Sequence, residues 1–357
     1  MRRGGRVIVL SSLVLTSLFI TSHCLCCTKP QTSAFMKQNE EASSLSLDHE
    51  EGYFPLSVLT YNAHSCVGSD GVYSVDRIAT VIKQANADIV CLQEVEFNDK
   101  AHQTTRVWSK PHQDDQPALI AERAGYHYYK FGAAIRSVAN PKYMTEVFSD
   151  VENGDGGGIF GVALLSKWPI VDSKVVMFAP YGKKTPRNVL ACQIEIPISS
   201  SAIDDNKDDT NDQKPTTDAT YSTNTKRIWV LCTHLGMHYR GLEQLQQAKE
   251  LILFLESIFE RKTTTDETST VILAGDFNSV SWFHGSVREI RKVLIEANRH
   301  DEGTFPAVGW LLRPGSFKLD YIFHSADVVC VDTHVEVVGA VASDHLAFYA
   351  SLKIKPN

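Results

Sequence analysis

The sequence predicts an α+β fold in which two β-sheets pack face to face and helices cover their outer sides. Short runs rich in Val, Ile, Leu and aromatic residues outnumber the helical segments, and the helical segments occur singly between those runs. Because a sheet buries its apolar face against another layer, many strands with few helices favour two packed sheets. The strand-like runs are 56–61, 88–93, 159–166, 174–178, 187–196, 227–235, 271–275, 319–323, 327–339 and 346–352.

Three helices are predicted from apolar residues that recur at helical spacing. The first follows Ser74 and covers 75–85. The second covers 287–297, and it begins with Ser286 and Glu289 at the spacing of a capping box. The third runs from 242 to 260.

The N-terminal residues 1–27 have the order of a secretory leader, with Arg2, Arg3 and Arg6 before an apolar run. The same segment is long enough to stay as a signal anchor, so both a cleaved signal peptide and an anchor remain open. Either one places the protein in the secretory pathway, secreted or membrane-anchored with a lumenal or extracellular domain.

The rest of the chain divides into a tether and one folded domain. Residues 28–52 are polar without periodicity and indicate a flexible linker. Residues 53–357 form the domain, interrupted at 199–226 by an acidic, polar tract that we expect to be a disordered insertion between neighbouring strands.

Charge and cysteine usage narrow the function classes. The chain has 35 Lys and Arg against 42 Asp and Glu, a net charge of −7, and no dense basic run outside the leader, so it has no strong nucleic-acid footprint. Four cysteines lie in strand-like runs without CxxC spacing, which favours buried free thiols over zinc ligands or a disulfide framework: Cys91, Cys192, Cys232 and Cys330.

Polar side chains stand at one end of several predicted strands. Each alone has an ordinary explanation, because Asn and Asp make turns and a single His often has a structural role. Together they indicate one functional site, since rigid scaffolds place chemistry at strand ends. The residues are Asn62, Glu94, His234, Asp276, Asn278, Asp320, Asp344 and His345.

These residue types favour magnesium chemistry on a phosphoester. Mg²⁺ prefers oxygen ligands and is held by one or two carboxylates, which Glu94 with Asn62 and one of Asp320 or Asp344 would supply. Zinc is disfavoured because the chain has no HExxH motif and the sites that offer His are scattered. A neutral His oriented by a carboxylate can take a proton from water.

The motifs LTYNAH, LQEVE, THLG, GDFN, LDYIF and SDH, in this order over residues 56–352, resemble the endonuclease/exonuclease/phosphatase superfamily of DNase I-like, metal-dependent phosphoesterases. The stretch HSCVGSDGVYSVDRIATVI and the later TFPA resemble a branch that includes the catalytic-like domain of GPI-anchor lipid remodelling proteins. The resemblance implies a four-layer α/β/β/α sandwich of two mostly antiparallel sheets, with the site at one rim.

The resemblance also implies a role for each site residue. Asn62 and Glu94 would bind the metal, Mg²⁺ with Mn²⁺ as the alternative, and Asp344 would contact the metal or lie in its outer shell. His345 would activate water, oriented by Asp320. The remaining three residues would act on the nucleophile and the phosphate: Asp276 would position or deprotonate the nucleophile, and Asn278 and His234 would hold the phosphate.

We therefore expect a Mg²⁺-dependent phosphoester hydrolase of the secretory route, acting on a phosphodiester as a monomer. Three alternatives stay open at this stage. The protein could be a membrane-lipid-directed phosphodiesterase or GPI-anchor lipid remodelling factor, in which case its N-terminal segment would associate with a membrane. It could be a secreted nuclease, or a non-catalytic metal-binding module.

Overall fold

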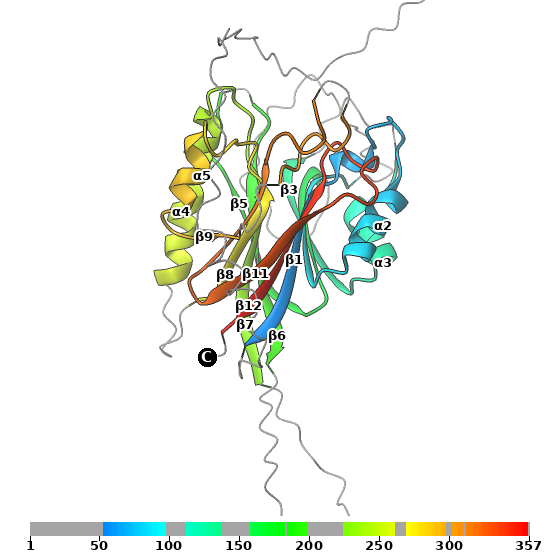
Figure 1. The fold of residues 1–357 in the computed structure, drawn as a ribbon. Coiled ribbons are helices and arrows are strands. Elements are labelled where there is room, and N and C mark those ends of the chain that lie inside the picture. The colour runs from blue at the N-terminus through cyan, green and yellow to red at the C-terminus, as the bar shows by residue number, and fades with distance from the viewer. Residues whose placement is uncertain are drawn as a thin grey trace, which may run out of the picture. The chain divides into compact units, whose positions relative to one another are not determined.

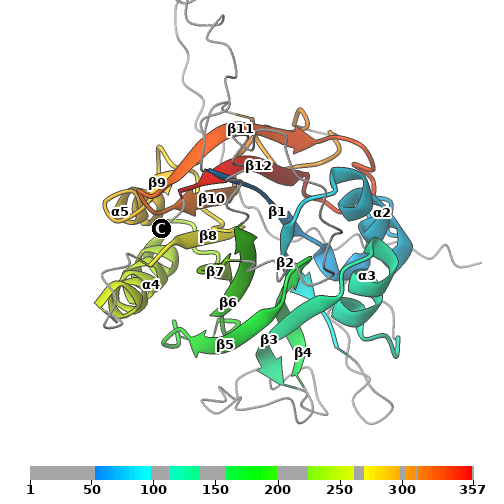
Figure 2. The same ribbon diagram turned by 90° about the horizontal axis from the view of Figure 1, so that it is seen from below.

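The computed structural model describes residues 53–97, 112–136, 158–182, 184–198, 224–260, 269–297, 302–309 and 312–355. These residues form two six-stranded sheets that pack against each other, with helices on both outer sides (Figures 1 and 2). The predicted fold class is confirmed. The predicted leader and linker, 1–52, and most of the acidic insertion lie outside the described residues.

The first sheet has the order β11-β12-β1-β2-β4-β3. β1 and β2 run parallel and the other neighbours are antiparallel. Its strands are β1 (Phe54–Asn62), β2 (Ile89–Val95), β3 (Tyr128–Arg136), β4 (Gly158–Ser166), β11 (Val328–Glu336) and β12 (Ala347–Ile354).

The second sheet has the order β5-β6-β7-β8-β10-β9. β7 and β8 form its parallel pair, and the other neighbours are again antiparallel. Its strands are β5 (Ile170–Met177), β6 (Asn188–Ile198), β7 (Asn224–His234), β8 (Val271–Asp276), β9 (Ile295–Glu296) and β10 (Asp320–His324).

Three hydrophobic cores separate the four layers. Because successive side chains of a strand point to opposite faces, Val230 lies in the core between the sheets while its neighbour Leu231 faces a helix. The core between the sheets also holds Cys91, Cys192 and Cys232, which are buried free thiols as predicted, whereas Cys330 is a free thiol that is only partly buried. Within the described residues, no helix combines the length and apolar character needed to cross a bilayer.

Among the described residues, two α-helices cover the first sheet and two cover the second (Figure 1). α2 (Val75–Ala85) matches its prediction and begins at Ser74, whose side chain accepts a hydrogen bond from the Arg77 amide. α3 (Gln116–Ala124), capped by Asp115, was not predicted. α4 (Leu242–Glu260) also matches its prediction.

The predicted helix over 287–297 is wrong in both its start and its length. α5 (Gly285–Ile290) has His284 at its N-cap, and the Ser286 hydroxyl lies inside the helix, where it donates to Ser279 instead of capping. The chain then leaves the helix and pairs as β9 with β10. The apolar spacing arose because Leu294 and Ala297 fill two different cores.

The end of the acidic insertion also needs correction. β7 begins at Asn224 and pairs with the end of β6, so residues 224–226 belong to a strand and not to the insertion. Lys226 is buried there and donates to the carbonyl of Lys355.

Strand direction brings the polar strand ends together at one rim. β1 with β2 and β7 with β8 are parallel, so their carboxyl ends meet there. β10 and β12 run antiparallel to β8 and β1, so they begin at the same rim. Gly275 allows close approach of β7 and β8, since a Cβ at this position would lie 2.0 Å from the Thr233 carbonyl oxygen.

Candidate active site

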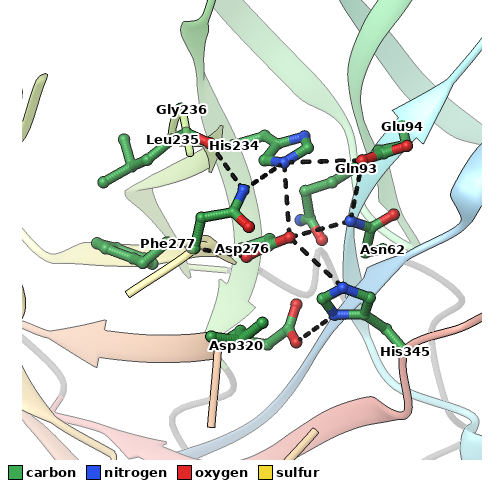
Figure 3. A network of polar contacts seen from close by, with 12 residues as sticks. Asn62, Gln93, Glu94, His234, Leu235, Gly236, Asp276, Phe277, Asp320 and His345 are labelled. Carbon is green, nitrogen blue, oxygen red and sulfur yellow. Dashed lines mark hydrogen bonds and ion pairs between the residues drawn. The ribbon is translucent and has the colours of Figure 1, made fainter. Parts of the chain in front are cut away.

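The rim gathers most of the residues singled out in the sequence into one polar cluster. The ends of β1, β2, β7 and β8 and the starts of β10 and β12 each contribute one side chain (Figure 3). These side chains are Asn62, Glu94, His234, Asp276, Asp320 and His345.

His345 and Asp320 form a buried pair. The His345 Nδ1 atom lies 2.9 Å from Asp320 Oδ2, and the imidazole Nε2 atom faces Asp276 Oδ2 at 3.8 Å. The ring packs against Phe305, with 5.0 Å between ring centroids. The Asp320 carboxylate therefore holds one ring nitrogen and leaves the other directed into the site.

The pKa values at the site report a surplus of buried negative charge. Burial alone lowers the pKa of His345, but the charges of Asp320 and Asp276 outweigh it and raise this pKa to about 10. Burial and the neighbouring Asp320 charge raise the pKa of Asp276 to about 7. Both shifts favour an added positive charge, a proton or a cation, beside Asp276.

Glu94 reaches the site through a backbone irregularity. The pairing of β2 with β4 shifts register between Gln93 and Val95, so Glu94 is the extra residue of a β-bulge. Its φ of 54° lies in the left-handed region, which is unusual for a residue with a side chain and occurs most at functional sites. The bulge turns the Glu94 carboxylate toward Asn62 (Figure 3).

Asn62 lies between two carboxylates. Its Nδ2 atom donates to Asp276 Oδ2 at 3.0 Å and lies 3.5 Å from Glu94 Oε1. The structure thus brings together the two predicted metal ligands, Asn62 and Glu94, and places Asp276 beside them. The amide hydrogens supply part of the positive charge that these carboxylates require.

The donor set fits a hard divalent cation. Ligand atoms of Asp276, Asp320 and His345 lie within 4.8 Å of one another, and Asp276 accepts a hydrogen bond from Asn62, which also faces Glu94. The second carboxylate oxygen of Asp320, Oδ1, is buried and accepts no hydrogen bond from the residues that the structure describes. Buried carboxylate oxygens close together are the ligands that Mg²⁺ and Mn²⁺ prefer.

Hydrogen-bond donors converge on the other side of Asp276. The Asn278 backbone amide donates to Asp276 Oδ1, and the Asn278 Nδ2 atom lies 3.0 Å from both His234 Nε2 and the Leu235 carbonyl oxygen. His234 Nε2 is also 3.5 Å from Asp276 Oδ2. The two residues predicted to hold the phosphate therefore contact each other beside the carboxylate cluster.

Arg187 is the site residue that the sequence analysis missed. Its Nη1 atom lies 3.2 Å from His234 Nδ1, so donor groups flank both nitrogens of a ring that accepts only one hydrogen bond when neutral. Burial lowers the pKa of Arg187, while the charges of Glu94 and Asp276 act in the opposite direction. This surplus of donors suits an anionic oxygen.

One signal could have identified Arg187. It stands with Asn188 just before the apolar run of β6, as Asp344 and His345 stand before β12. Since β6 is antiparallel to β7, its start lies at the rim where His234 ends β7.

Asp344 lies at the edge of the cluster. Its Oδ1 atom is 3.8 Å from His64 Nδ1, and the Ser343 hydroxyl lies 3.4 Å from the same oxygen. The metal-binding role of Asp344 stays a prediction.

The sandwich and the carboxylate–histidine rim together define a metal-dependent phosphoesterase. The model of the endonuclease/exonuclease/phosphatase family matches residues 59–345. The chain therefore belongs to this family, whose members are metal-dependent phosphoesterases, and the superfamily resemblance seen in the sequence is confirmed. The resemblance to the GPI-anchor lipid remodelling branch stays a prediction.

Solved structures share the fold. An endonuclease/exonuclease/phosphatase of Beutenbergia cavernae is 22% identical with a TM-score of 0.58, and the match covers 84% of this chain and 72% of that chain. An endonuclease/exonuclease/phosphatase of Bacteroides vulgatus is 15% identical with a TM-score of 0.56, and the match covers 85% of this chain and 100% of that chain. A mannosyl-6-phosphatase of Bacteroides thetaiotaomicron is 16% identical with a TM-score of 0.55, and the match covers 83% of this chain and 99% of that chain. No curated protein matches the chain in sequence.

Mg²⁺ is expected to stabilise the folded protein through Glu94. At about a hundredfold excess over its Kd, a ligand of the folded state adds about 2.7 kcal/mol to the free energy of unfolding. For a domain of this size, that raises the midpoint of thermal unfolding by on the order of 5 °C. Glu94→Gln keeps the side-chain shape but removes one charge, so the rise should fall to about 1 °C.

Differential scanning fluorimetry with and without Mg²⁺ measures this effect. Glu289→Gln, which alters a surface ion pair between Glu289 on α5 and Lys292 just after it, is the matched control and should keep the full rise. An equal rise in the Glu94→Gln variant would show that the ion binds elsewhere.

Proposed function

We propose that the protein is a Mg²⁺-dependent phosphodiester hydrolase in which His345 activates the attacking water. The observation that carries this proposal is the buried His345–Asp320 pair, whose free imidazole nitrogen faces the Asp276 carboxylate. A His held by a carboxylate at one nitrogen and open at the other is suited to take a proton.

Each residue has a role that its contacts support. Asp320 holds the Nδ1 proton of His345, so Nε2 is the atom that receives the proton of the attacking water. Asn62 and Glu94 would hold the ion, and Asp276 would position the attacking water beside His345. When bound, a divalent cation offsets the carboxylate charge, which favours neutral His345, and stabilises charge on the phosphoryl oxygens.

The donor-rich side of the site would hold the phosphoryl group. Asn278, His234 and Arg187 present amide, imidazole and guanidinium donors beside the same Asp276 carboxylate. Fixed donors aimed at oxygens that gain charge in the transition state lower the barrier more than they strengthen ground-state binding. The loss of one of them should therefore reduce kcat more than it raises KM.

Replacing the proposed base should abolish most of the turnover. His345→Ala should lower kcat for bis(p-nitrophenyl) phosphate roughly a thousandfold, because the proton acceptor is gone. Asp320→Asn should lower kcat about a hundredfold with little change in KM, because the ring loses its orientation. His334→Ala on β11, an exposed His that pairs with Glu336, is the control and should retain full activity.

EDTA should stop wild-type turnover, and added Mg²⁺ should restore it, with Mn²⁺ as the alternative ion. Parallel assays with p-nitrophenyl phosphate distinguish a diesterase from a monoesterase. Turnover that persists in both EDTA and His345→Ala would contradict the proposed chemistry, and Mg²⁺ binding without any turnover would instead favour a non-catalytic module.

We also propose that the protein enters the secretory route through residues 1–27. The support is the order of three arginines followed by an apolar run, which is typical of a secretory leader. A reporter enzyme that carries these residues at its N-terminus should appear in the medium or on the lumenal side of a membrane. Replacing the apolar run by polar residues should leave it in the cytosol, and a reporter that is cytosolic with the native segment would refute the proposal.

A further inference from the structure

A patch of exposed apolar side chains lies next to the phosphate-holding side of the site. Among the described residues, Trp282 and Tyr239 keep 79% and 72% of their surface exposed, and Phe283 keeps 61%. Exposed apolar residues that gather in one patch often mark a surface that binds another molecule. We call the set the rim patch, and its members are Met237, Tyr239, Leu242, Trp282 and Phe283.

Two loops build the rim patch, and both leave the site directly. One follows His234 at the end of β7, and the other follows Asn278 after β8. His284 joins them, since it lies against Gly241 and forms a hydrogen bond to the Tyr239 backbone. The rings of Trp282 and Phe283 are in contact, with 5.9 Å between their centroids.

Buried hydrogen bonds fix the rim patch relative to the site. Gln244, which is buried at the start of α4, donates to the carbonyl of Asn278 and accepts from the backbone amide of His238. The loop that carries Tyr239 is therefore tied to a residue of the site. A surface that binds the rim patch would be held at a fixed position with respect to Asn278.

A third loop at the same rim adds to the apolar surface. Val337 and Val338 are exposed in the turn between β11 and β12, and Val341 follows them three residues before Asp344. This turn leads into His345. Exposed apolar residues thus stand on loops adjoining both the phosphate-holding and the proton-accepting side of the site.

Two cations lie in contact with the rim patch, although the whole chain carries a net charge of −7. The Arg240 guanidinium stacks over the Tyr239 ring at 5.2 Å, and Lys184 donates to the Met237 carbonyl. Exposed Trp, Tyr and Phe beside Lys and Arg is the combination found where proteins lie in a membrane interface. The cations complement lipid phosphate groups.

We propose that the rim patch docks the protein on a lipid bilayer and presents the phosphoester headgroup of a membrane lipid to the site. This inference rests on the proposed hydrolase function and specifies its substrate class. A nucleic-acid strand fits the patch less well, because Met237 and Leu242 cannot stack on bases and no basic stripe accompanies them. A small apolar ligand would be enclosed in a pocket, whereas the Trp282 ring stands out in solvent.

Vesicle binding of the full-length chain tests the docking surface. Vesicles of phosphatidylcholine with phosphatidylserine are sedimented with wild-type protein and with the double variant Trp282→Ser/Phe283→Ser. The double variant should bind vesicles at least about tenfold more weakly than the wild type, because it loses two exposed aromatic rings of its loop. Leu253→Ser, an equally exposed apolar residue on α4, is the matched control and should bind as the wild type does.

Hydrolysis separates docking from chemistry. The double variant should lose vesicle-lipid hydrolysis in proportion to its binding and keep wild-type turnover of bis(p-nitrophenyl) phosphate. If wild-type protein leaves the soluble diester intact, the hydrolase proposal fails, while vesicle binding still tests the docking surface. The midpoint of thermal unfolding of the double variant is the control for folding, and it should equal the wild-type midpoint.

A milder variant gives a second readout. Brominated phosphatidylcholine should quench wild-type tryptophan fluorescence, and Trp282→Phe should bind vesicles normally while losing part of the quenching. Equal vesicle binding by the wild type and the Trp282→Ser/Phe283→Ser variant would overturn the proposal. A dimer in solution that this double variant dissociates would also overturn it, since the occupant would then be a second copy of the chain.

Discussion

The structure depends on one electrostatic constraint, which is that two carboxylates are buried together at the rim of the sandwich. Asp276 and Asp320 are both buried, and the pKa of Asp276 rises to about 7 because burial and the charge of Asp320 oppose its ionisation. Buried charges of one sign need opposite charge or donors close by. Asn62 Nδ2 and the Asn278 backbone amide donate hydrogen bonds to Asp276, and the imidazole rings of His234 and His345 lie 3.5 Å and 3.8 Å from its Oδ2 atom.

The sheet topology creates this crowding from residues that are far apart in sequence. One parallel pair in each sheet delivers two strand ends to the rim, and the antiparallel partners of those strands begin there. Gly275 and the Glu94 bulge are local adjustments that serve the same end, because the first lets β7 and β8 approach and the second turns a carboxylate toward Asn62. Fold and chemistry are therefore linked at the level of individual backbone positions.

Much of this arrangement is predictable from sequence, because strand ends carry their own signal. The apolar runs that stop at Asn62, His234 and Asp276 each indicate a buried strand. The polar residue at which the run stops marks the end of that strand. The structure brings these groups together as expected. Arg187 was missed because its position beside His234 depends on the pairing of β6 with β7. The helix over 287–297 was predicted too long because Leu294 and Ala297 follow helical spacing while contacting different cores, and tertiary packing decides such cases.

The central claim is that the polar cluster at this rim binds one hard cation through Glu94 and Asn62. Crystals of the protein soaked in Mn²⁺ would locate the ion by its anomalous scattering. An anomalous peak is expected in direct contact with the carboxylate of Glu94 and the amide oxygen of Asn62. A peak bound by other residues, or a fully occupied crystal surface site with no ion at the rim, would contradict it.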